Sequence, residues 1–215
     1  MTKIILQLIF FISFFNIVAQ NSKFEIGPEI GLNISDFRYI EAKYVKGSDI
    51  KRISFGITGK LNFSRNWALK SKLKYEGKGI LIEVGSFERG LLTQKLNYLV
   101  MPLMAEWRLG KGNLQGYLNF GIYGSRLMSA RQELIKVNST MGEKDIKNNK
   151  DEFKPYDSGF SGGIGAIYKL KKNLKITLDL GGQYGMSPID SELKSGTGWR
   201  ANQNLSGNIG MLIGL

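Results

Sequence analysis

The chain has 215 residues, with 42% hydrophobic residues, 27 Gly and only 4 Pro, which allows one domain or one small closed barrel and excludes a disordered chain. His and Cys are both absent, so zinc sites, thiol nucleophiles and the common catalytic triads are excluded. The net charge of +12 forms no basic pattern, so it favours a surface facing anionic lipid headgroups or envelope sugars over nucleic-acid binding.

The N-terminal segment has the features of an export signal. Lys3 supplies a positive charge, residues 4–18 form a mostly apolar run, and Ala19 offers a small residue for cleavage. The run is too short for a comfortable membrane-spanning helix of about 20 residues. Residues 1–20 are therefore predicted to be a cleaved signal peptide and residues 21–215 an outer-membrane β-barrel domain, with an uncleaved anchor as the alternative. The absence of Cys excludes a lipoprotein.

Eight segments alternate apolar and polar residues with the period of a β-strand. In chain order they are residues 24–35, 53–63, 67–76, 97–109, 115–129, 159–170, 174–184 and 205–215. The fourth is apolar on both faces and contains Pro102, and the fifth carries Tyr117 and Tyr123 on its otherwise polar face, so the orientation of these two is ambiguous. The sixth has an unusually small polar face, rich in Gly.

The connections between the segments alternate in length. Residues 64–66, 110–113 and 171–173 are hairpin turns, whereas residues 36–52, 79–96, 130–158 and 185–204 are long polar stretches. In an up-and-down barrel every second connection lies at the same rim, while a Greek-key sandwich has no reason to sort its loops by parity. The pattern predicts an all-β, eight-stranded antiparallel up-and-down transmembrane β-barrel. The short turns and both mature termini are expected to face the periplasm.

The polar face of these segments carries charges of both signs. They are Glu25, Glu29, Lys60, Lys70, Lys72, Lys74, Glu76, Lys175 and Asp179. We expect them to line the lumen as an ion-pair network, because a buried charge needs a partner, and the apolar face to meet lipid. A soluble lipocalin-like barrel, with the opposite polarity, is the alternative. Aromatic residues near segment ends suit interfacial girdles; they are Trp67, Tyr75, Trp107, Tyr168 and Tyr184.

Few residues suggest chemistry. Glu25 and Glu29 share a strand face, but their spacing exceeds the separation of a glycosidase carboxylate pair, so we interpret them as lumen charges paired with lysines. Gly163 and Gly165 lack the third glycine of a dinucleotide loop and lie within a strand. No catalytic, cofactor-binding or metal-binding residues are assigned, and no cofactor is expected. The mixed-charge stretch 130–156 is interpreted as a solvated loop and, by its length, as the main external contact surface.

Three stretches of the chain carry a family resemblance; they are FEIGPEIGLNISDF (Phe24–Phe37), LNYLVMPLMAEWRLG (Leu96–Gly110) and DSGFSGGIGAIYKL (Asp157–Leu170). Through these stretches, and over nearly the whole mature chain, the sequence resembles the PorT-like outer-membrane β-barrel family of Bacteroidota. The most specific part of the resemblance is Asn97, Tyr98 and Pro102. The resemblance implies an eight-stranded barrel in the outer membrane but no uniform biochemical role. Leu215 departs from the terminal Phe that many such barrels carry.

We therefore expect a non-enzymatic outer-membrane barrel that acts as a structural scaffold or as an interaction or accessory subunit, with its loops displayed outside. The alternative is a small-solute channel or transport-associated barrel, for which the lysine-rich face of residues 67–76 is the only indication. An enzyme acting on envelope lipid or glycan is disfavoured by the missing residue types. Expected partners are outer-membrane lipid and lipopolysaccharide, and other envelope proteins through the loops, but not nucleic acid.

Overall fold

The computed structural model describes residues 23–40, 47–84, 90–136, 144–171, 173–192 and 199–215. The strands are β1 (Lys23–Ile40), β2 (Gly47–Asn62), β3 (Trp67–Val84), β4 (Gly90–Leu109), β5 (Leu114–Lys136), β6 (Lys144–Asn148), β7 (Tyr156–Lys171), β8 (Leu174–Gly185) and β9 (Trp199–Gly214), with one 3-10 turn, η1 (Lys150–Glu152). Within these ranges no helix is long and apolar enough to cross a membrane.

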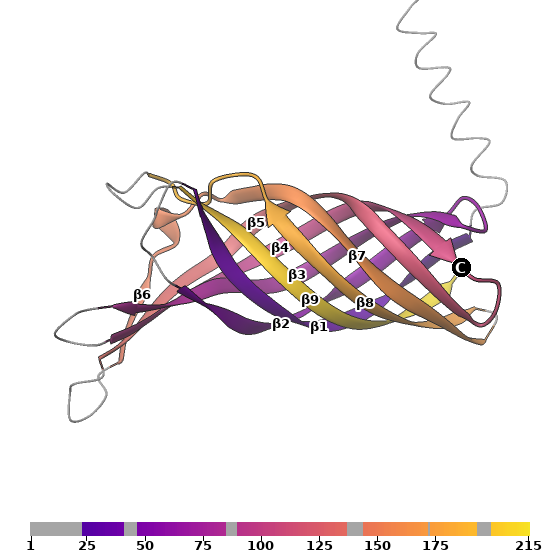
Figure 1. Ribbon diagram of the computed structural model, residues 1–215, viewed down its shortest axis with the longest axis horizontal. Helices are drawn as coiled ribbons and strands as arrows, with labels where there is room; N and C mark the ends of the chain where they lie inside the picture. The colour runs from indigo at the N-terminus through magenta and orange to yellow at the C-terminus, as the bar shows by residue number, and fades with distance from the viewer. Residues whose placement is uncertain (1–22, 41–46, 85–89, 137–143, 172, 193–198) are drawn as a thin grey trace, which may run out of the picture.

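Eight of the strands form a closed antiparallel barrel. Each strand pairs with the next in the order β1, β2, β3, β4, β5, β7, β8 and β9, and β9 pairs with β1 to close the ring. Figure 1 shows the strands winding obliquely around a common axis. The short strand β6 lies outside the ring and pairs with β5. The predicted eight-stranded barrel is confirmed, because every strand of the ring finds both of its neighbours.

The short turns lie together at one end of the barrel. They join β2 to β3, β4 to β5 and β7 to β8, as the sequence predicts. Lys23 pairs with Asn62 beside the first of these turns, and the Leu215 N–H donates to the Phe24 carbonyl at 2.8 Å. Both ends of the described chain are therefore at the end with the short turns. The predicted signal peptide, residues 1–20, lies outside the described residues.

The outside of the barrel is apolar and the inside is charged. Phe120 and Leu32 are 65% and 61% exposed, whereas Lys60 and Glu106 are 1% and 0% exposed. Other exposed apolar side chains follow every strand of the ring; they include Ile30, Ile53, Phe55, Leu73, Met101, Leu118, Ile122, Ile164, Leu178, Leu205 and Ile209. The predicted polarity is confirmed, and the lipocalin-like alternative is wrong, since a barrel in water would hide the apolar face.

The closed barrel shows which side chains of the two ambiguous strands, β4 and β5, point into the lumen. In β4 the side chains of Tyr98, Val100 and Glu106 point inward and are fully buried. In β5 Tyr117 and Tyr123 also point inward, and each is 2% exposed. The lumen therefore contains aromatic and aliphatic groups as well as charges, which is why alternation alone does not assign these faces.

The long connections are not the plain polar loops that the sequence predicts. Part of each stretch belongs to strands that are longer than the sequence predicts, because their backbone groups still find partners in neighbouring strands. We call the largest such extension the wing: residues 80–84 of β3, 90–95 of β4, 130–136 of β5, and β6. Pairing of β5 with β7 ends at Arg126 and Tyr156, so the wing is an open sheet that projects beyond the closed ring (Figure 1).

Candidate functional site

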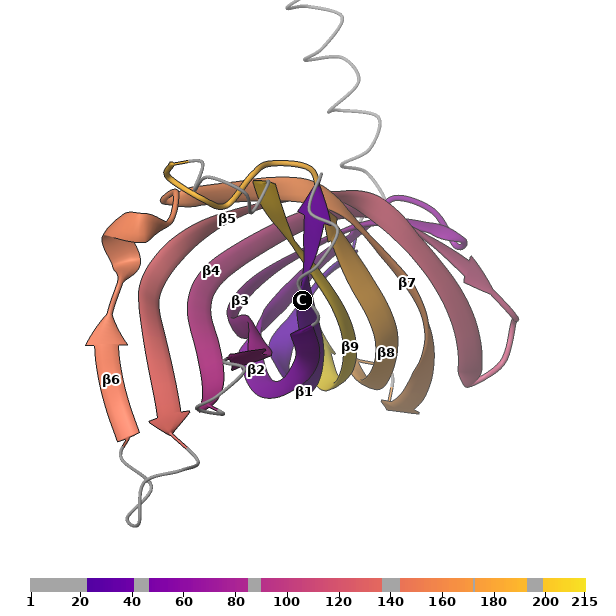
Figure 2. The same ribbon diagram turned by 60° about the vertical axis from the view of Figure 1, so that its left-hand side comes forward.

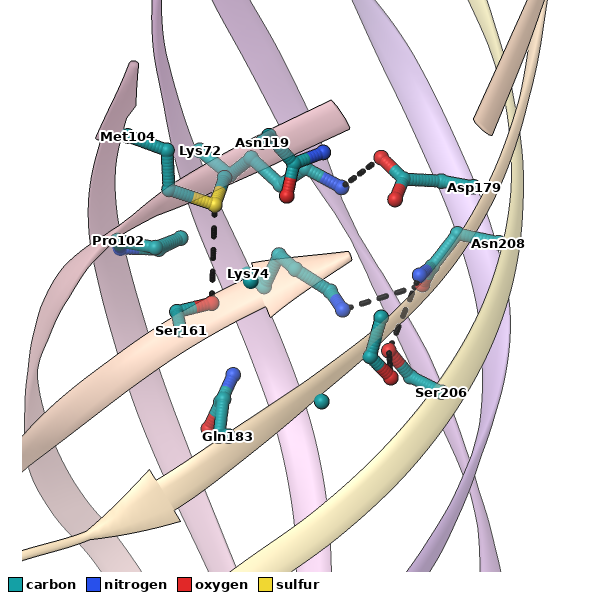
Figure 3. A pocket seen from close by; sticks show the side chains of 13 residues that line it. Lys72, Lys74, Pro102, Met104, Asn119, Ser161, Asp179, Gln183, Ser206 and Asn208 are labelled. Atoms are coloured by element: carbon teal, nitrogen blue, oxygen red, sulfur yellow. Dashed lines mark hydrogen bonds and ion pairs between the residues drawn. The ribbon is translucent and has the colours of Figure 1, made fainter. Parts of the chain in front are cut away.

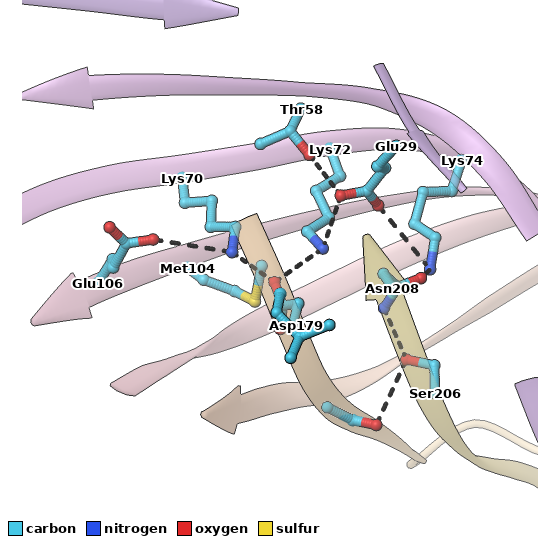
Figure 4. Close-up of polar contacts among 12 residues, drawn as sticks. Glu29, Thr58, Lys70, Lys72, Lys74, Met104, Glu106, Asp179, Ser206 and Asn208 are labelled. Carbon is cyan, nitrogen blue, oxygen red and sulfur yellow. Dashed lines mark hydrogen bonds and ion pairs between the residues drawn. The ribbon is translucent and has the colours of Figure 1, made fainter. Parts of the chain in front are cut away.

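Three lysines of β3 cross the lumen to carboxylates on other strands (Figure 4). Lys70 Nζ lies 2.6 Å from Asp179 Oδ2 of β8, and Lys72 Nζ lies 3.1 Å from the same oxygen and 2.9 Å from Glu29 Oε2 of β1. Lys74 Nζ donates to Asn208 Oδ1 of β9 at 3.1 Å and lies 3.6 Å from Glu76 Oε1. The alternating strand places all three on one face, so they form a ladder along the lumen.

A second group of charges lies nearer the short turns. Lys60 Nζ is 2.7 Å from Glu106 Oε1, and Arg108 Nε is 3.5 Å from the same carboxylate oxygen. Lys175 pairs with Glu25. Glu106 also lies 3.7 Å from Lys70, so this group is continuous with the ladder. One network therefore runs through the lumen from the short turns to its middle.

Cations and carboxylates are balanced inside the barrel. The buried cations of the lumen are Lys60, Lys70, Lys72, Lys74, Lys78 and Arg108, and the buried carboxylates are Glu25, Glu29, Glu76, Glu106, Asp157 and Asp179. A buried ion without a partner is costly, because the low-dielectric interior does not replace its hydration. The matched numbers keep each charge within reach of an opposite one, so the network fills the lumen without a large excess charge.

The cavity that lies among the residues of the ladder is small. A cavity of about 20 Å³ lies between Lys72 and Lys74 on one side and Asp179 and Asn208 on the other (Figure 3). That volume is enough for about one water molecule. Gly162 of β7 and Gly181 and Gly182 of β8 also line this cavity. Elsewhere on β7, a Cβ at Gly165 would lie 2.3 Å from the Tyr117 ring. The small face of β7 thus gives the long side chains from β3 and β5 the room to cross the lumen.

The lumen becomes apolar toward the wing. Buried apolar side chains from four strands and two connecting segments pack together there; they are Phe37, Ile80, Leu96, Tyr98, Val100, Tyr123, Leu127, Ala130, Phe153 and Ile189. Phe153 and Ile189 come from the segments that follow η1 and β8. We call residues 149–155 and 186–191 the cap, because they close this end of the barrel with buried apolar side chains.

Specific polar contacts hold the cap in place. The Lys154 N–H donates to the Ile189 carbonyl at 2.7 Å, and the Ile189 N–H donates to the Arg200 carbonyl at 2.8 Å. The Arg200 guanidinium donates to Asp190 Oδ1 and lies 5.5 Å from the Phe37 ring centre and 5.3 Å from that of Phe153. Such charge-assisted and cation–π contacts order a segment that would otherwise be a loop. The stretch 130–156 is therefore not the solvated loop that the sequence predicts, because its described residues contain strand, a 3-10 turn and buried anchors; its prediction as an external contact surface stays a prediction.

The residues considered for chemistry have other partners. Glu25 pairs with Lys175 and Glu29 with Lys72, which confirms their interpretation as lumen charges. Gly163 and Gly165 lie within β7 against the neighbouring strand β8, as interior packing predicts. Among the described residues no three His, Cys, Asp or Glu side chains are grouped so that they could hold a metal ion.

Sequence reasoning missed part of the network. Glu106 and Arg108 lie in the ambiguous fourth segment, and Asp157 falls in the predicted connection 130–158. Asp157 instead lies at the start of β7 and accepts hydrogen bonds from Tyr123 Oη at 3.1 Å and Asn202 Nδ2 at 2.9 Å. Glu106 and Arg108 alternate with the apolar residues Ala105, Trp107 and Leu109, and this alternation could have placed both on the lumen face.

A closed barrel with an apolar exterior and a paired, charged interior defines a transmembrane β-barrel protein. The model of the outer membrane protein beta-barrel domain family matches residues 18–191, so the chain belongs to this family, whose place is the outer membrane. The match is to this family as a whole and not to a PorT-like group within it.

Solved structures share the fold at low sequence identity. The outer membrane protein OprG from Pseudomonas aeruginosa is 15% identical, with a TM-score of 0.57 and coverage of 90% of this chain and 96% of that chain. A major outer membrane protein from Thermus thermophilus is 11% identical, with a TM-score of 0.51 and coverage of 91% of this chain and 100% of that chain. No curated protein sequence matches the chain. These similarities show the fold alone.

Proposed function

We propose that this protein is a closed, non-enzymatic scaffold in the outer membrane, which holds the cap and the wing outside the cell as surfaces for interaction. The filled lumen carries this proposal. The lysines of β3 that first suggested a solute path each have a carboxylate or amide partner, and the cavity among them is about 20 Å³. A path for solutes would need space and unpaired polar groups along the axis.

The two unlike ends of the barrel support one orientation in the membrane. Barrels of this kind have short periplasmic turns and longer external extensions. We infer that the end with the three short turns and both described chain ends faces the periplasm, and that the cap and wing face outward. Residues 1–20 would be the signal peptide that directs export, consistent with this placement.

Lipid and lipopolysaccharide are the expected partners of the barrel wall. Arg126 lies on the outward face of β5, four residues beyond the exposed Ile122, and Arg131 is also exposed. Positive side chains at the upper limit of an apolar band suit the phosphates of outer-leaflet lipid. Within the family we infer the PorT-like branch from Asn97, Tyr98 and Pro102. Tyr98 is a buried member of the apolar cluster below the cap.

Planar-bilayer recording tests the scaffold against the channel. We expect purified wild-type protein to show no sustained unitary conductance. The variant Lys72→Ala/Asp179→Ala removes a bridge across the lumen without changing its net charge, and it should show small conductance steps because the space is widened. Conductance of this variant therefore shows that the protein inserts into the bilayer under the conditions of the assay. Sustained conductance of the wild type would refute the scaffold and indicate the small-solute channel instead.

A further inference from the structure

The outer wall of the barrel is basic along one side, at the end that carries the wing. This side is formed by β2 to β5, and Figure 2 shows β3, β4 and β5 next to one another there. Its polar residues include Arg52 of β2, Lys95 and Asn97 of β4, and Arg126, Ser129 and Arg131 of β5. We call these residues the basic patch.

The basic patch begins where the apolar band of the barrel ends. On β4 the exposed apolar side chains run from Trp107 to Leu99, which is enough for one crossing of about 9–11 residues. The next outward-facing residue of β4 is Asn97. Arg126 lies directly opposite Leu99 on β5, and on its other side it lies opposite Tyr156, which is 66% exposed. Aromatic residues mark the two interfaces of a membrane barrel, so the patch lies at the level of the lipid head groups.

A row of hydrogen bonds crosses the patch from β2 to β5. Arg52 Nη2 donates to Asn97 Oδ1 at 2.7 Å, and Asn97 Nδ2 donates to Ser129 Oγ at 2.9 Å. Arg52 reaches Asn97 over Gly77 of β3, where an added Cβ would lie 2.7 Å from Arg52 Nε. Gly77 is on the same strand face as Leu73, which is 48% exposed, so the row lies on the outer wall. It presents a cation, an amide and a hydroxyl side by side.

The two arginines of β5 have no carboxylate partner in the described part of the chain. Arg131 lies directly opposite Lys95, and like charges in such a pair destabilise a sheet. Glu133 is the next outward-facing residue of β5, but it pairs with Lys95 at 2.7 Å and with Lys144 at 3.3 Å. The guanidiniums of Arg126 and Arg131 are therefore left for an anion from outside the chain.

A cation on the opposite side of the barrel is held by its own chain. Arg38 belongs to β1, which lies across the ring from β5. Its guanidinium donates to the Gly185 carbonyl at 2.9 Å and lies 4.3 Å from the centre of the Tyr184 ring. The carboxylate of Asp36 lies two residues away on the same strand face. The unpaired arginines of the basic patch thus distinguish one side of the barrel from the other.

A phosphorylated sugar is the ligand that matches these groups. Arginine guanidiniums bind phosphate through paired N–H donors. Amide and hydroxyl groups, such as those of Asn97 and Ser129, bind the hydroxyl groups of a sugar. The headgroup of a simple anionic phospholipid would use the cations and leave this row without a ligand. In the outer leaflet, the lipid that combines phosphate with sugar at the membrane surface is lipopolysaccharide.

We propose that the basic patch binds the phosphorylated headgroup of lipid A, the membrane anchor of lipopolysaccharide, from the leaflet around the barrel. Arg126 and Arg131 hold the phosphate, Asn97 and Ser129 bind sugar hydroxyls, and the acyl chains lie against apolar side chains such as Leu99. The site rests on the proposed function, in which this end of the barrel faces outward.

Lipid binding to the purified protein tests the proposal. Protein refolded into detergent micelles contains no lipopolysaccharide of its own, and native mass spectrometry counts the lipids that it takes up. We expect one lipid A per protein, bound at least tenfold more tightly than phosphatidylglycerol and than lipid A without its phosphates, because charge-assisted hydrogen bonds are strong. High salt should weaken binding, since the patch is exposed.

Charge variants locate the site. Arg126→Gln/Arg131→Gln should weaken lipid A binding at least tenfold. Lys147→Gln/Lys150→Gln removes the same charge from exposed residues outside the patch and should bind like wild type. Heat-modifiable gel migration checks that each variant is folded. Equal binding by wild type and the arginine variant would overturn the patch as the site.

Asn97→Ala/Ser129→Ala separates recognition of the sugar from attraction to charge. This variant should bind lipid A more weakly and phosphatidylglycerol as well as wild type does, because only the sugar uses the amide and the hydroxyl. If phosphatidylglycerol binds wild-type protein as tightly as lipid A does, the patch attracts any anionic lipid and lipid A is the wrong ligand.

A separate measurement distinguishes failure of the site from failure of the orientation. Binding in micelles does not depend on which way the barrel faces. The chain has no Cys, so the variant Lys150→Cys can be labelled at one place by a membrane-impermeant maleimide. Labelling of intact cells, together with wild-type protein that does not bind lipid A, overturns the site alone. Labelling only after lysis overturns the outward orientation, and with it lipopolysaccharide as the ligand.

Discussion

Toward the short turns the lumen is filled mainly by charged side chains, whereas toward the wing apolar side chains predominate around a smaller buried group that includes Lys78 and Asp157. Along β4 the change runs from Arg108 and Glu106 to Val100, Tyr98 and Leu96. In the first half, a buried ion is stable only while its oppositely charged partners are present. In the second half, stability depends on how closely the apolar side chains fill the space. The two halves should therefore respond differently when a side chain is removed, although both seal the barrel.

The largest effect is expected from Glu106→Gln in the charged half. The change keeps the volume but leaves Lys60 and Arg108 buried without their carboxylate, which should destabilise the barrel by about 3–5 kcal/mol. Urea unfolding of the protein in lipid vesicles, followed by Trp fluorescence, measures this. The double variant Lys60→Met/Glu106→Met removes both charges and should recover much of the loss; a double variant as unstable as Glu106→Gln would contradict the account of unpaired charge.

A comparable but chemically different effect is expected from Leu127→Ala in the apolar half. Leu127 is 1% exposed within the cluster below the cap, and its truncation should cost about 2–5 kcal/mol through lost burial and a residual cavity. The same unfolding assay measures it. The outward-facing neighbour Met128 is the control, because Met128→Ala leaves no internal cavity. If truncation of a second cluster residue restored the lost stability, the apolar half would respond like the charged half, and the proposed difference between them would be wrong.

The smallest effect is expected outside the barrel, at Glu133 of the wing. The hydrogen bond from Lys95 at 2.7 Å, together with Lys144, lowers the pKa of Glu133 below its usual value. A lowered pKa in the folded state stabilises the wing above the ordinary glutamate pKa of about 4.3, and this contribution is lost as the pH falls through the lowered value. Hydrogen exchange of residues 130–136 should therefore quicken below about pH 4 relative to the barrel strands.

Glu133→Gln separates this contribution from general effects of acid. The variant should exchange faster than wild type at neutral pH and should lose most of the pH dependence in this range. If wild type and variant respond to acid in the same way, Glu133 does not stabilise the wing.

The sequence by itself determined the barrel. Strand alternation from Phe24 onward and the parity of long and short connections predicted the number of barrel strands and the turns, because both follow from local periodicity and chain connectivity. The polarity of the barrel was predicted from the charges on one face and not from alternation. Lysines and carboxylates on one face also predicted an ion-pair network, since buried charges require partners.

Only the tertiary structure decided which charges meet and how the open end is closed. Lys70 meets Asp179 across 109 positions of sequence, and no local pattern encodes that distance. Phe153 and Ile189 look like isolated apolar residues in polar stretches, and they become cap anchors only when the ring brings Phe37 and Leu127 beneath them. The strand β6 likewise pairs with β5 only because the pairing of β5 with β7 ends at Arg126, which leaves residues 131–135 of β5 available to β6.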